Sequence, residues 1–220
     1  MTTLTAQNLR FGYSPQQSIL DDWNGEFKSG RSYAIVGPSG SGKSSLMFLL
    51  GLMLTPTSGS LLLDGVATDT MRDRPRARMR ANRYGFVFQD ACLDPTRTVL
   101  DNILQPAAWR GVTRGTLVES AQQWVKRLEI DVPLNRRPGE VSGGQAQRIA
   151  LARALLSSPD IVLADEPTGN LDSHSSKKVI DALLEHCASG SVLAIVTHDP
   201  AVAQQCDEIV TLGSVHGDPS

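Results

Sequence analysis

Three short and almost uninterrupted apolar runs stand out along the chain, at residues 32–36, 161–164 and 192–196. A strand with one face in water alternates apolar and polar residues, whereas a strand covered on both faces by helices is apolar throughout. The three runs therefore predict central strands of a parallel sheet. Two further strands are expected at residues 84–88 and 208–212.

Helical spacing of apolar residues fills much of the remaining sequence. Short apolar segments mixed with turn residues predict small antiparallel strands between Leu4 and Phe27, and a further strand is expected at residues 60–65. Helices are expected at residues 45–50, 100–108, 116–128, 145–156 and 175–187. Residues 1–220 are thus expected to form one α/β domain, whose core of residues 1–89 and 159–220 carries a helical insertion at residues 90–158.

The segment after the first central strand reads Gly-Pro-Ser-Gly-Ser-Gly-Lys-Ser at residues 37–44, which fits the phosphate-binding P-loop pattern. Its glycines allow backbone N–H groups to converge on phosphate oxygens, and the start of the following helix adds partial positive charge. Lys43 can then reach the outer phosphates, while the Ser44 hydroxyl can bind Mg²⁺. A glycine-rich turn without a ligand is the alternative, but strand, loop and helix follow in the order that the motif requires. The expected nucleotide contacts are Gly37, Ser39, Gly40, Ser41, Gly42, Lys43, Ser44 and Ser45.

Two carboxylates, Asp165 and Glu166, follow the second central strand. The carboxyl ends of parallel strands are where an open α/β sheet binds its ligand. Asp165 is thus placed to hold the Mg²⁺ that Ser44 also touches, and Glu166 to orient or deprotonate a water that attacks the γ-phosphate. By itself such a pair is often only a strand end that meets solvent, but the upstream P-loop favours the functional interpretation.

A second glycine-containing segment, Val141-Ser142-Gly143-Gly144-Gln145, opens the helix expected at residues 145–156. Ser142 and Gln145 have the spacing of a helix capping box, which explains the pattern structurally. Two consecutive glycines at a helix start also allow close approach by a phosphate, which the helix macrodipole attracts. The two explanations are compatible, so the segment is a second candidate phosphate site.

The charge of the chain limits the partners that it is expected to bind. A formal net charge of -2 supplies no global attraction for nucleic acid or acidic lipid. The most basic stretch, residues 72–83, contains six arginines and one acid. A nucleic-acid or anionic-lipid patch is one interpretation, but a solvated helix face is favoured because no aromatic residue is interleaved.

Cys92, Cys187 and Cys206 are widely spaced and match no metal-ligand pattern, so reduced thiols in a cytosolic compartment are expected. The N-terminus shows neither the basic nor the apolar region of a secretion signal. The longest nearly apolar run, residues 46–54, is too short to cross a bilayer. Any role at a membrane is therefore expected to be exerted from the cytosolic side through a partner.

Together, the P-loop, the Asp-Glu strand end and residues 141–145 resemble the nucleotide-binding subunit of an ABC transporter, over nearly the whole chain from Tyr13 to His198. Residues 141–145 are similar to the family signature Leu-Ser-Gly-Gly-Gln, with Val141 in place of leucine. The resemblance implies a P-loop NTPase core of the RecA-like kind, with an N-terminal antiparallel β subdomain and an inserted α-helical subdomain. It also implies ATP and Mg²⁺ as cofactors and ATP hydrolysis as the activity.

The resemblance further implies roles for individual residues. Tyr13, for which simple packing is otherwise favoured, resembles the family's adenine-stacking aromatic. Gln89 resembles the glutamine that contacts Mg²⁺ and the attacking water and links the site to the helical insertion. Asp172 resembles an acid that communicates across a dimer, and His198 a histidine that contacts the γ-phosphate. The implied catalytic residues are Lys43, Gln89, Glu166 and His198, the implied metal ligands are Ser44, Gln89 and Asp165, and Ser142, Gly143, Gly144, Gln145 and Asp172 complete the nucleotide site.

The family resemblance also implies partners. ATP is expected to lie between the P-loop of one chain and the signature of another, in a head-to-tail dimer of two copies or with a related ATPase subunit. Dimer closure is expected to drive an integral-membrane permease, contacted near Leu93 to Val99, for export or for lipoprotein or peptide extrusion. Residues 165–172 are similar to the branch that includes macrolide and peptide exporters, lipoprotein-releasing ATPases and the cell-division ATPase.

Two other functions compete with transport at this point. An ATP-gated regulatory module of a membrane complex, of the cell-division type, would transport nothing yet share these motifs. A DNA-repair or chromosome ATPase is disfavoured because the sequence has no long coiled-coil insertion and no net basic charge, so binding to nucleic acid is not expected. The expected location is the cytosolic face of the inner membrane, with membrane contact only through the permease.

Overall fold

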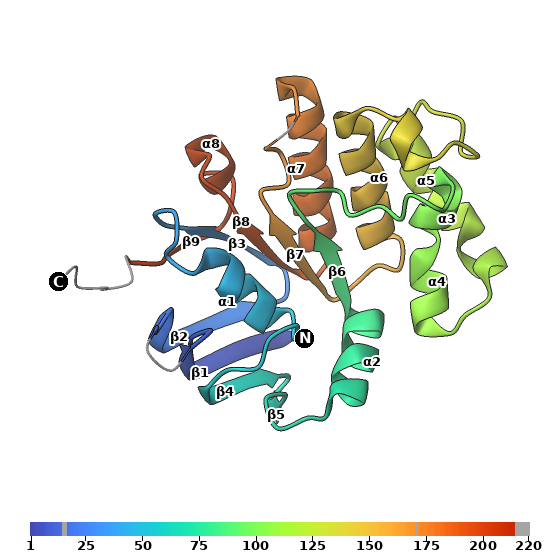
Figure 1. The fold of residues 1–220 in the computed structure, drawn as a ribbon. Helices are drawn as coiled ribbons and strands as arrows, with labels where there is room; N and C mark the ends of the chain where they lie inside the picture. The colour runs from blue at the N-terminus through green and yellow to red at the C-terminus, as the bar shows by residue number, and fades with distance from the viewer. Residues whose placement is uncertain (15–16, 170, 214–220) are drawn as a thin grey trace.

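The computed structural model describes residues 1–14, 17–169 and 171–213, which form two β-sheets with helix α1 (Lys43–Leu50) between them (Figure 1). The antiparallel sheet has the strand order β2-β1-β4-β5, and the parallel sheet has the order β6-β7-β8-β3-β9. The strands are β1 (Thr3–Phe11), β2 (Leu20–Lys28), β3 (Arg31–Val36), β4 (Ser58–Leu63), β5 (Val66–Ala67), β6 (Tyr84–Val87), β7 (Ile161–Asp165), β8 (Val192–Val196) and β9 (Glu208–Thr211).

Both faces of the parallel sheet are buried, as the continuous apolar runs predict. Along β7, Ile161 and Leu163 pack in the core cluster that contains α1. Val162 and Ala164 pack in the other cluster, which contains α7 (Ser173–Ala188). Because parallel strands all point the same way, the loops after β3, β7 and β8 lie at one edge of the sheet. Those loops carry the P-loop, the two carboxylates and His198.

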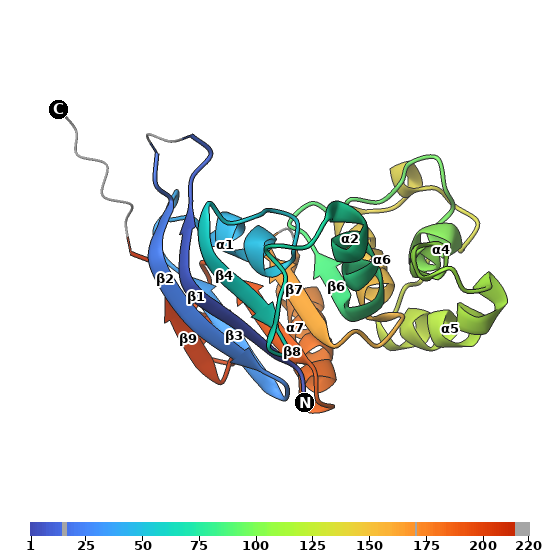
Figure 2. The ribbon, with the colours of Figure 1, turned by 90° about the horizontal axis from the view of Figure 1, so that it is seen from below.

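The helical insertion lies beside the core, on the side away from the antiparallel sheet, as Figure 2 shows. Its elements are α3 (Val99–Ile103), α4 (Gln105–Arg110), η1 (Arg114–Leu117), α5 (Val118–Arg127), η2 (Pro138–Glu140) and α6 (Gly143–Leu155). The single helix expected at residues 100–108 is broken at Leu104, because Pro106 lies in the first turn of α4 and has no N–H to continue the preceding helix. Helix α6 packs on β6 and joins the insertion to the core. The expected subdomain boundaries at residues 90 and 158 stay a prediction.

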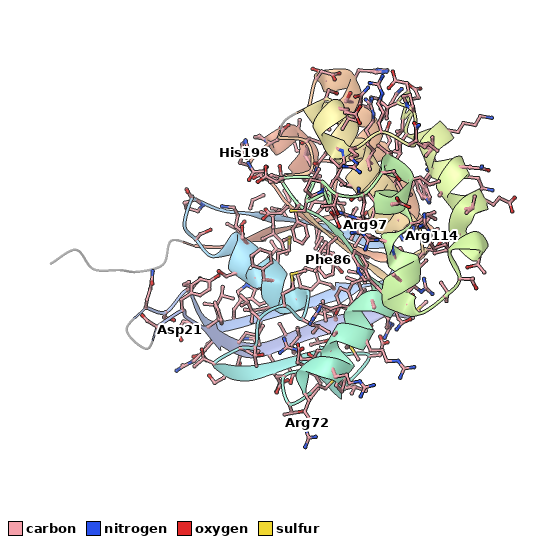
Figure 3. The ribbon with its side chains drawn as sticks, turned by 45° about the vertical axis from the view of Figure 1, so that its right-hand side comes forward. Asp21, Arg72, Phe86, Arg97, Arg114 and His198 are labelled. Atoms are coloured by element: carbon pink, nitrogen blue, oxygen red, sulfur yellow. The ribbon has the colours of Figure 1, made fainter. Side chains whose placement is uncertain are left out.

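The arginine-rich helix α2 (Asp73–Arg83) differs from the solvated face expected for it. Arg72 and Arg78 are exposed, and Figure 3 shows Arg72 projecting away from the molecule. Arg76, by contrast, is buried, and its guanidinium donates to the carbonyl of Leu52 at 2.9 Å, just beyond the end of α1. The expectation is wrong for Arg76, because the main-chain carbonyl of the buried Leu52 needs a hydrogen-bond donor and the guanidinium supplies one.

The structure also bears on several smaller expectations. The antiparallel strands β1 and β2 are each nine residues long rather than small. All three cysteines are free thiols. Helix α8 (Pro200–Ala203) precedes β9. Within the described ranges, no helix has both the length and the apolar character needed to span a bilayer.

Candidate nucleotide-binding site

The P-loop connects β3 to α1 through a backbone that depends on glycine. Gly40 and Gly42 have φ angles of 78° and 91°, in the left-handed region that favours glycine. A Cβ atom on Gly42 would also lie 2.6 Å from Cγ2 of Ile19, which is too close for an undistorted side chain. Gly42 is the N-cap residue of α1 and supplies no capping side chain.

The first amides of α1 lack a protein acceptor. In the part of the chain that the structure describes, the four N–H groups of residues 42–45 donate neither to a backbone carbonyl nor to a capping side chain. Free N–H groups at a helix start form a binding site for an anion. Lys43 lies in the same turn, where its Nζ donates to the carbonyls of Gly37 and Pro38 at 2.9 and 2.8 Å. The loop therefore gathers four N–H groups and an ammonium, a donor set that fits phosphate.

Ser44 and Asp165 bring two oxygen ligands together at the carboxyl edge of the sheet. The Ser44 hydroxyl donates to Oδ2 of Asp165 at 3.2 Å, across 121 residues of sequence. Burial raises the pKa of Asp165 above its ordinary value, and the neighbouring Glu166 adds to the rise, while the hydrogen bond from Ser44 opposes it. Hydroxyl and carboxylate oxygens are ligands that Mg²⁺ prefers, and a cation here would compensate the buried negative charge. The donor set therefore fits Mg²⁺.

Glu166 and His198 form a second pair beside the first. Nδ1 of His198 donates to Oε1 of Glu166 at 2.8 Å, because a carboxylate only accepts. The two side chains differ in exposure, with 13% of Glu166 and 78% of His198 accessible, and Figure 3 shows His198 at the surface. Glu166 also has a φ of 45°, and such backbone strain is common at functional sites. Both residues line a cavity of about 570 Å³.

Tyr13 and Gln89 come from other elements. The Tyr13 hydroxyl lies 3.3 Å from Oγ of Ser45, and its ring packs edge-on against Phe11, with 5.0 Å between the centroids. Because 64% of Tyr13 is exposed, the residue combines packing with an open ring. Gln89 follows β6, is exposed, and its side chain makes no hydrogen bond within the described ranges. The roles implied for Tyr13 and Gln89 stay predictions.

The signature segment is held by its own helix. The Ser142 hydroxyl accepts from the Gln145 N–H at 3.3 Å, while Oε1 of Gln145 accepts from the Ser142 N–H at 2.9 Å, so the predicted capping box is confirmed. Gly143 is exposed, and a Cβ atom there would meet nothing within 4 Å. Where the structure describes the chain, no hydrogen bond or ion pair joins residues 142–145 to residues 37–45. The two candidate phosphate sites are therefore not brought together by these bonds within one chain.

The sequence does not predict the structural roles of three polar residues. Asp172 is the N-cap residue of α7 and accepts N–H bonds from His174 and Ser175, both at 3.0 Å. The aspartate just before the helical run was its signal. Gln147 and Arg153 are buried on α6, where the only signal was a polar residue on an otherwise apolar face.

Fold and site define a nucleotide-binding protein in which a P-loop and an Asp-Glu strand end share one edge of a parallel sheet. The chain belongs to the ABC transporter family, whose model matches residues 20–169. The predicted fold is thereby confirmed, and the family defines ATP with Mg²⁺ as the ligand and ATP hydrolysis as the reaction.

Known relatives match the chain over most of its length. It is 43% identical over 193 residues to a probable syringafactin export ATP-binding/permease protein, SyfD, of Pseudomonas syringae pv. syringae (strain B728a), and the match covers 88% of this chain and 30% of that protein. The chain thus spans less than a third of that relative. It is 44% identical over 186 residues to the lipoprotein-releasing system ATP-binding protein LolD of Anaeromyxobacter dehalogenans (strain 2CP-C), covering 84% of this chain and 78% of that protein.

Solved structures show the same fold. The bacterial ABC transporter cassette MJ0796, described as dimeric, superposes with a TM-score of 0.87 at 32% identity and covers 97% of each chain. A second structure of MJ0796, described as a post-hydrolysis state bound to ADP and Pi, also gives a TM-score of 0.87, at 31% identity, covering 99% of this chain and 98% of that one.

Proposed function

We propose that this chain is the ATP-hydrolysing subunit of a transporter and energises a membrane permease for export or for lipoprotein or peptide extrusion. The observation that carries the proposal is the P-loop, whose four N–H groups at residues 42–45 have no acceptor among the described residues, set at the sheet edge that also carries the Ser44–Asp165 pair. The relatives include an export ATP-binding/permease protein and a lipoprotein-releasing ATP-binding protein, which favours extrusion over the alternatives.

The residues that bind the phosphates lie next to those that bind the metal. The N–H groups of residues 42–45 and the Lys43 ammonium bind the outer phosphates, with Lys43 exchanging its two loop carbonyls for phosphate oxygens. The Ser44 hydroxyl and the Asp165 carboxylate would hold Mg²⁺, with Gln89 as a further ligand. When bound there, the ion would supply positive charge beside the phosphates during transfer to water.

Glu166 and His198 act on the water that attacks the γ-phosphate. Glu166 accepts a proton from the water, since it lies next to the metal-binding Asp165 and is largely shielded from solvent. His198 orients the Glu166 carboxylate through the 2.8 Å hydrogen bond and presents its other ring nitrogen to the γ-phosphate. Tyr13 stacks its exposed ring on adenine at the opposite end of the nucleotide.

The remaining part of the site comes from a second chain. Ser142 and Gly143 lie at the start of α6, where exposed first-turn N–H groups suit a phosphate. In a head-to-tail pair, the signature of each chain faces the γ-phosphate of the ATP held by its partner, which is a second copy or a related ATPase subunit. ATP then joins the two chains, and hydrolysis removes contacts that favour the closed pair.

A groove of about 910 Å³ between α2, β6 and α4 is the proposed contact surface for the permease, in addition to the segment from Leu93 to Val99 expected from the sequence, which does not line it. Phe86, which Figure 3 shows between the core and the insertion, lines the groove and stacks on Phe88 with 5.9 Å between centroids. Met53 and Trp109 also line it and are 40% and 57% exposed. Large exposed apolar side chains around a groove are typical of interaction surfaces. The permease would thereby hold the chain at the cytosolic face of the inner membrane.

The test replaces the proposed base, Glu166→Gln, in the purified chain. Phosphate release is expected to fall by about 10²- to 10⁴-fold, since an amide cannot take the proton, whereas ATP affinity is retained. ATP should then accumulate a dimer, seen by size-exclusion chromatography. Glu119→Gln, an exposed glutamate on α5, is the matched control. Undiminished turnover in Glu166→Gln would refute the role given to Glu166.

A further inference from the structure

Side chains of α6, the helix that begins with the signature, donate hydrogen bonds to the main chain of the segment that carries Gln89. Gln147 is 4% exposed, and its Nε2 donates to the carbonyl of Phe88 at 2.9 Å. Phe88 is the residue directly before Gln89. A buried amide group of α6 therefore fixes the main chain on the N-terminal side of Gln89.

Arg153 fixes the same segment on its C-terminal side. Its Nη1 donates to the carbonyl of Cys92 at 2.7 Å, and its Nη2 donates to the carbonyl of Ala91 at 2.9 Å. Arg153 is 6% exposed and forms no ion pair within the described ranges. A buried cation is costly unless hydrogen bonds compensate it. The two hydrogen bonds therefore stabilise both the guanidinium and the position of the main chain at Ala91 and Cys92.

Between these attachments, the side chains of Gln89 and Asp90 are exposed and make no hydrogen bond in the described part of the chain. Farther along, Asp94 and the fully buried Asn102 exchange hydrogen bonds, with the Asp94 N–H donating to Oδ1 of Asn102 at 2.7 Å and Nδ2 of Asn102 donating to the Asp94 carbonyl at 3.1 Å. The loop is thus anchored on both sides of Gln89, while Gln89 itself is available to a ligand.

We propose that Gln147 and Arg153 are positioning residues for ATP hydrolysis, which place Gln89 by holding the main chain on either side of it. Because both lie on α6, the Gln89 loop would move with the helix whose N-cap residue is Ser142. A shift of α6 when Ser142 engages the partner's ATP then reaches Gln89 in the chain's own site. The inference rests on the proposed roles of Gln89 and of the signature.

A double-variant cycle in the purified chain tests the inference. Both Gln147→Met and Arg153→Met remove the donors; the first keeps side-chain length, and the second keeps the chain only as far as the position of Nε. Each is expected to lower kcat roughly tenfold to a hundredfold with KM for Mg·ATP little changed. In a Gln89→Ala background neither substitution should lower kcat further, because the residue that they place is gone. Arg153→Lys, which keeps a cationic donor, should recover part of the loss.

The control is Arg31→Met, which removes an exposed arginine paired with Glu208 on the far strands of the core. The inference would be overturned if either substitution lowered kcat in the Gln89→Ala background by the same factor as in the wild type. Wild-type kcat in Gln147→Met would overturn it as well. Both outcomes leave the ATPase function intact. A Gln89→Ala variant with wild-type turnover would overturn the role of Gln89 itself. Should Arg153→Met unfold at the assay temperature, Gln147→Met and Arg153→Lys still decide the question.

Discussion

The carboxylate of Asp172 accepts two backbone N–H bonds at the start of α7, and these have a consequence for acid stability. The N–H of Ser175, followed by its hydroxyl, lowers the pKa of Asp172 from 3.8 to about 2. A group whose pKa is lower in the folded chain stabilises it above the unfolded value and loses that contribution as pH falls. Asp172 is therefore expected to stabilise the chain fully above pH 3.8 and progressively less toward pH 2.

Asp172→Asn isolates this effect, because asparagine also caps helices but does not titrate. Thermal unfolding without nucleotide, followed from pH 6 down to the acid limit of the folded chain, should show a smaller acid-induced fall in Tm for the variant than for the wild type. Asp181→Asn is the control, since it removes the same charge from the same helix but away from the cap. Parallel pH profiles for Asp172→Asn and the wild type would contradict the assignment.

At the scale of elements, the contact between β6 and α6 depends on one glycine. A Cβ atom on Gly85 would lie 2.5 Å from the carbonyl oxygen of Ala154 and 2.9 Å from Cγ of Pro159. Gly85→Ala therefore forces β6 and α6 apart, and overpacking of this kind costs roughly 1–3 kcal/mol of unfolding free energy. Urea denaturation should show a lower midpoint with an unchanged slope.

Gly115→Ala provides the matched comparison for this prediction. Gly115 lies in η1, and a Cβ atom there would have no heavy atom within 4 Å. The free energy of unfolding of this variant is expected to stay within about 0.5 kcal/mol of the wild type. Equal destabilisation by the two substitutions would show that loss of glycine, and not the approach of α6 to β6, is responsible.

The elements that sequence predicts well are those whose signal is local. The P-loop is encoded by eight consecutive residues with a strand before it and a helix after it, and the apolar run of β7 follows directly from burial on both faces. The break at Leu104 is not in the sequence prediction, although Pro106 is its cause and stands in the sequence.

What sequence could not supply is the partner of a buried polar side chain. Arg76 and Arg153 both donate to main-chain carbonyls, and every residue has a carbonyl, so residue type gives no clue to which one is near. Although both arginines lie on helices, Arg76 binds the segment after α1, whereas Arg153 binds the Gln89 segment. Which segment each arginine binds depends on which distant part of the chain folds next to it.

For the whole molecule, the groove between α2, β6 and α4 has a charge opposite to that of the chain. Among the described residues that line it, five are arginines and none is acidic, although the chain carries a net charge of -2. A permease segment with carboxylates beside apolar side chains would complement this surface. Arg78→Glu should therefore weaken retention of the chain by membranes of its own organism, measured by co-sedimentation, by roughly tenfold.

Arg72→Glu makes the same charge change at the start of the same helix, but Arg72 does not line the groove. Its retention is expected to stay close to that of the wild type if the groove holds the permease. Equal losses for Arg72→Glu and Arg78→Glu would instead indicate general attraction of α2 to an anionic surface.

The proposed head-to-tail pair makes a sharp prediction, because in it each ATP site would be built from the P-loop of one chain and the signature of the other. In a Glu166→Gln background that traps ATP, neither Lys43→Ala nor Ser142→Arg should dimerise with ATP alone, since each variant damages both of its composite sites. A mixture of the two should dimerise, because one site of the mixed pair unites an intact P-loop with an intact signature. Size-exclusion chromatography with differently tagged chains measures this recovery. Mixing Lys43→Ala with Lys43→Met creates no intact site and should recover nothing, whereas a failure of the first mixture would place both motifs in the same chain's site.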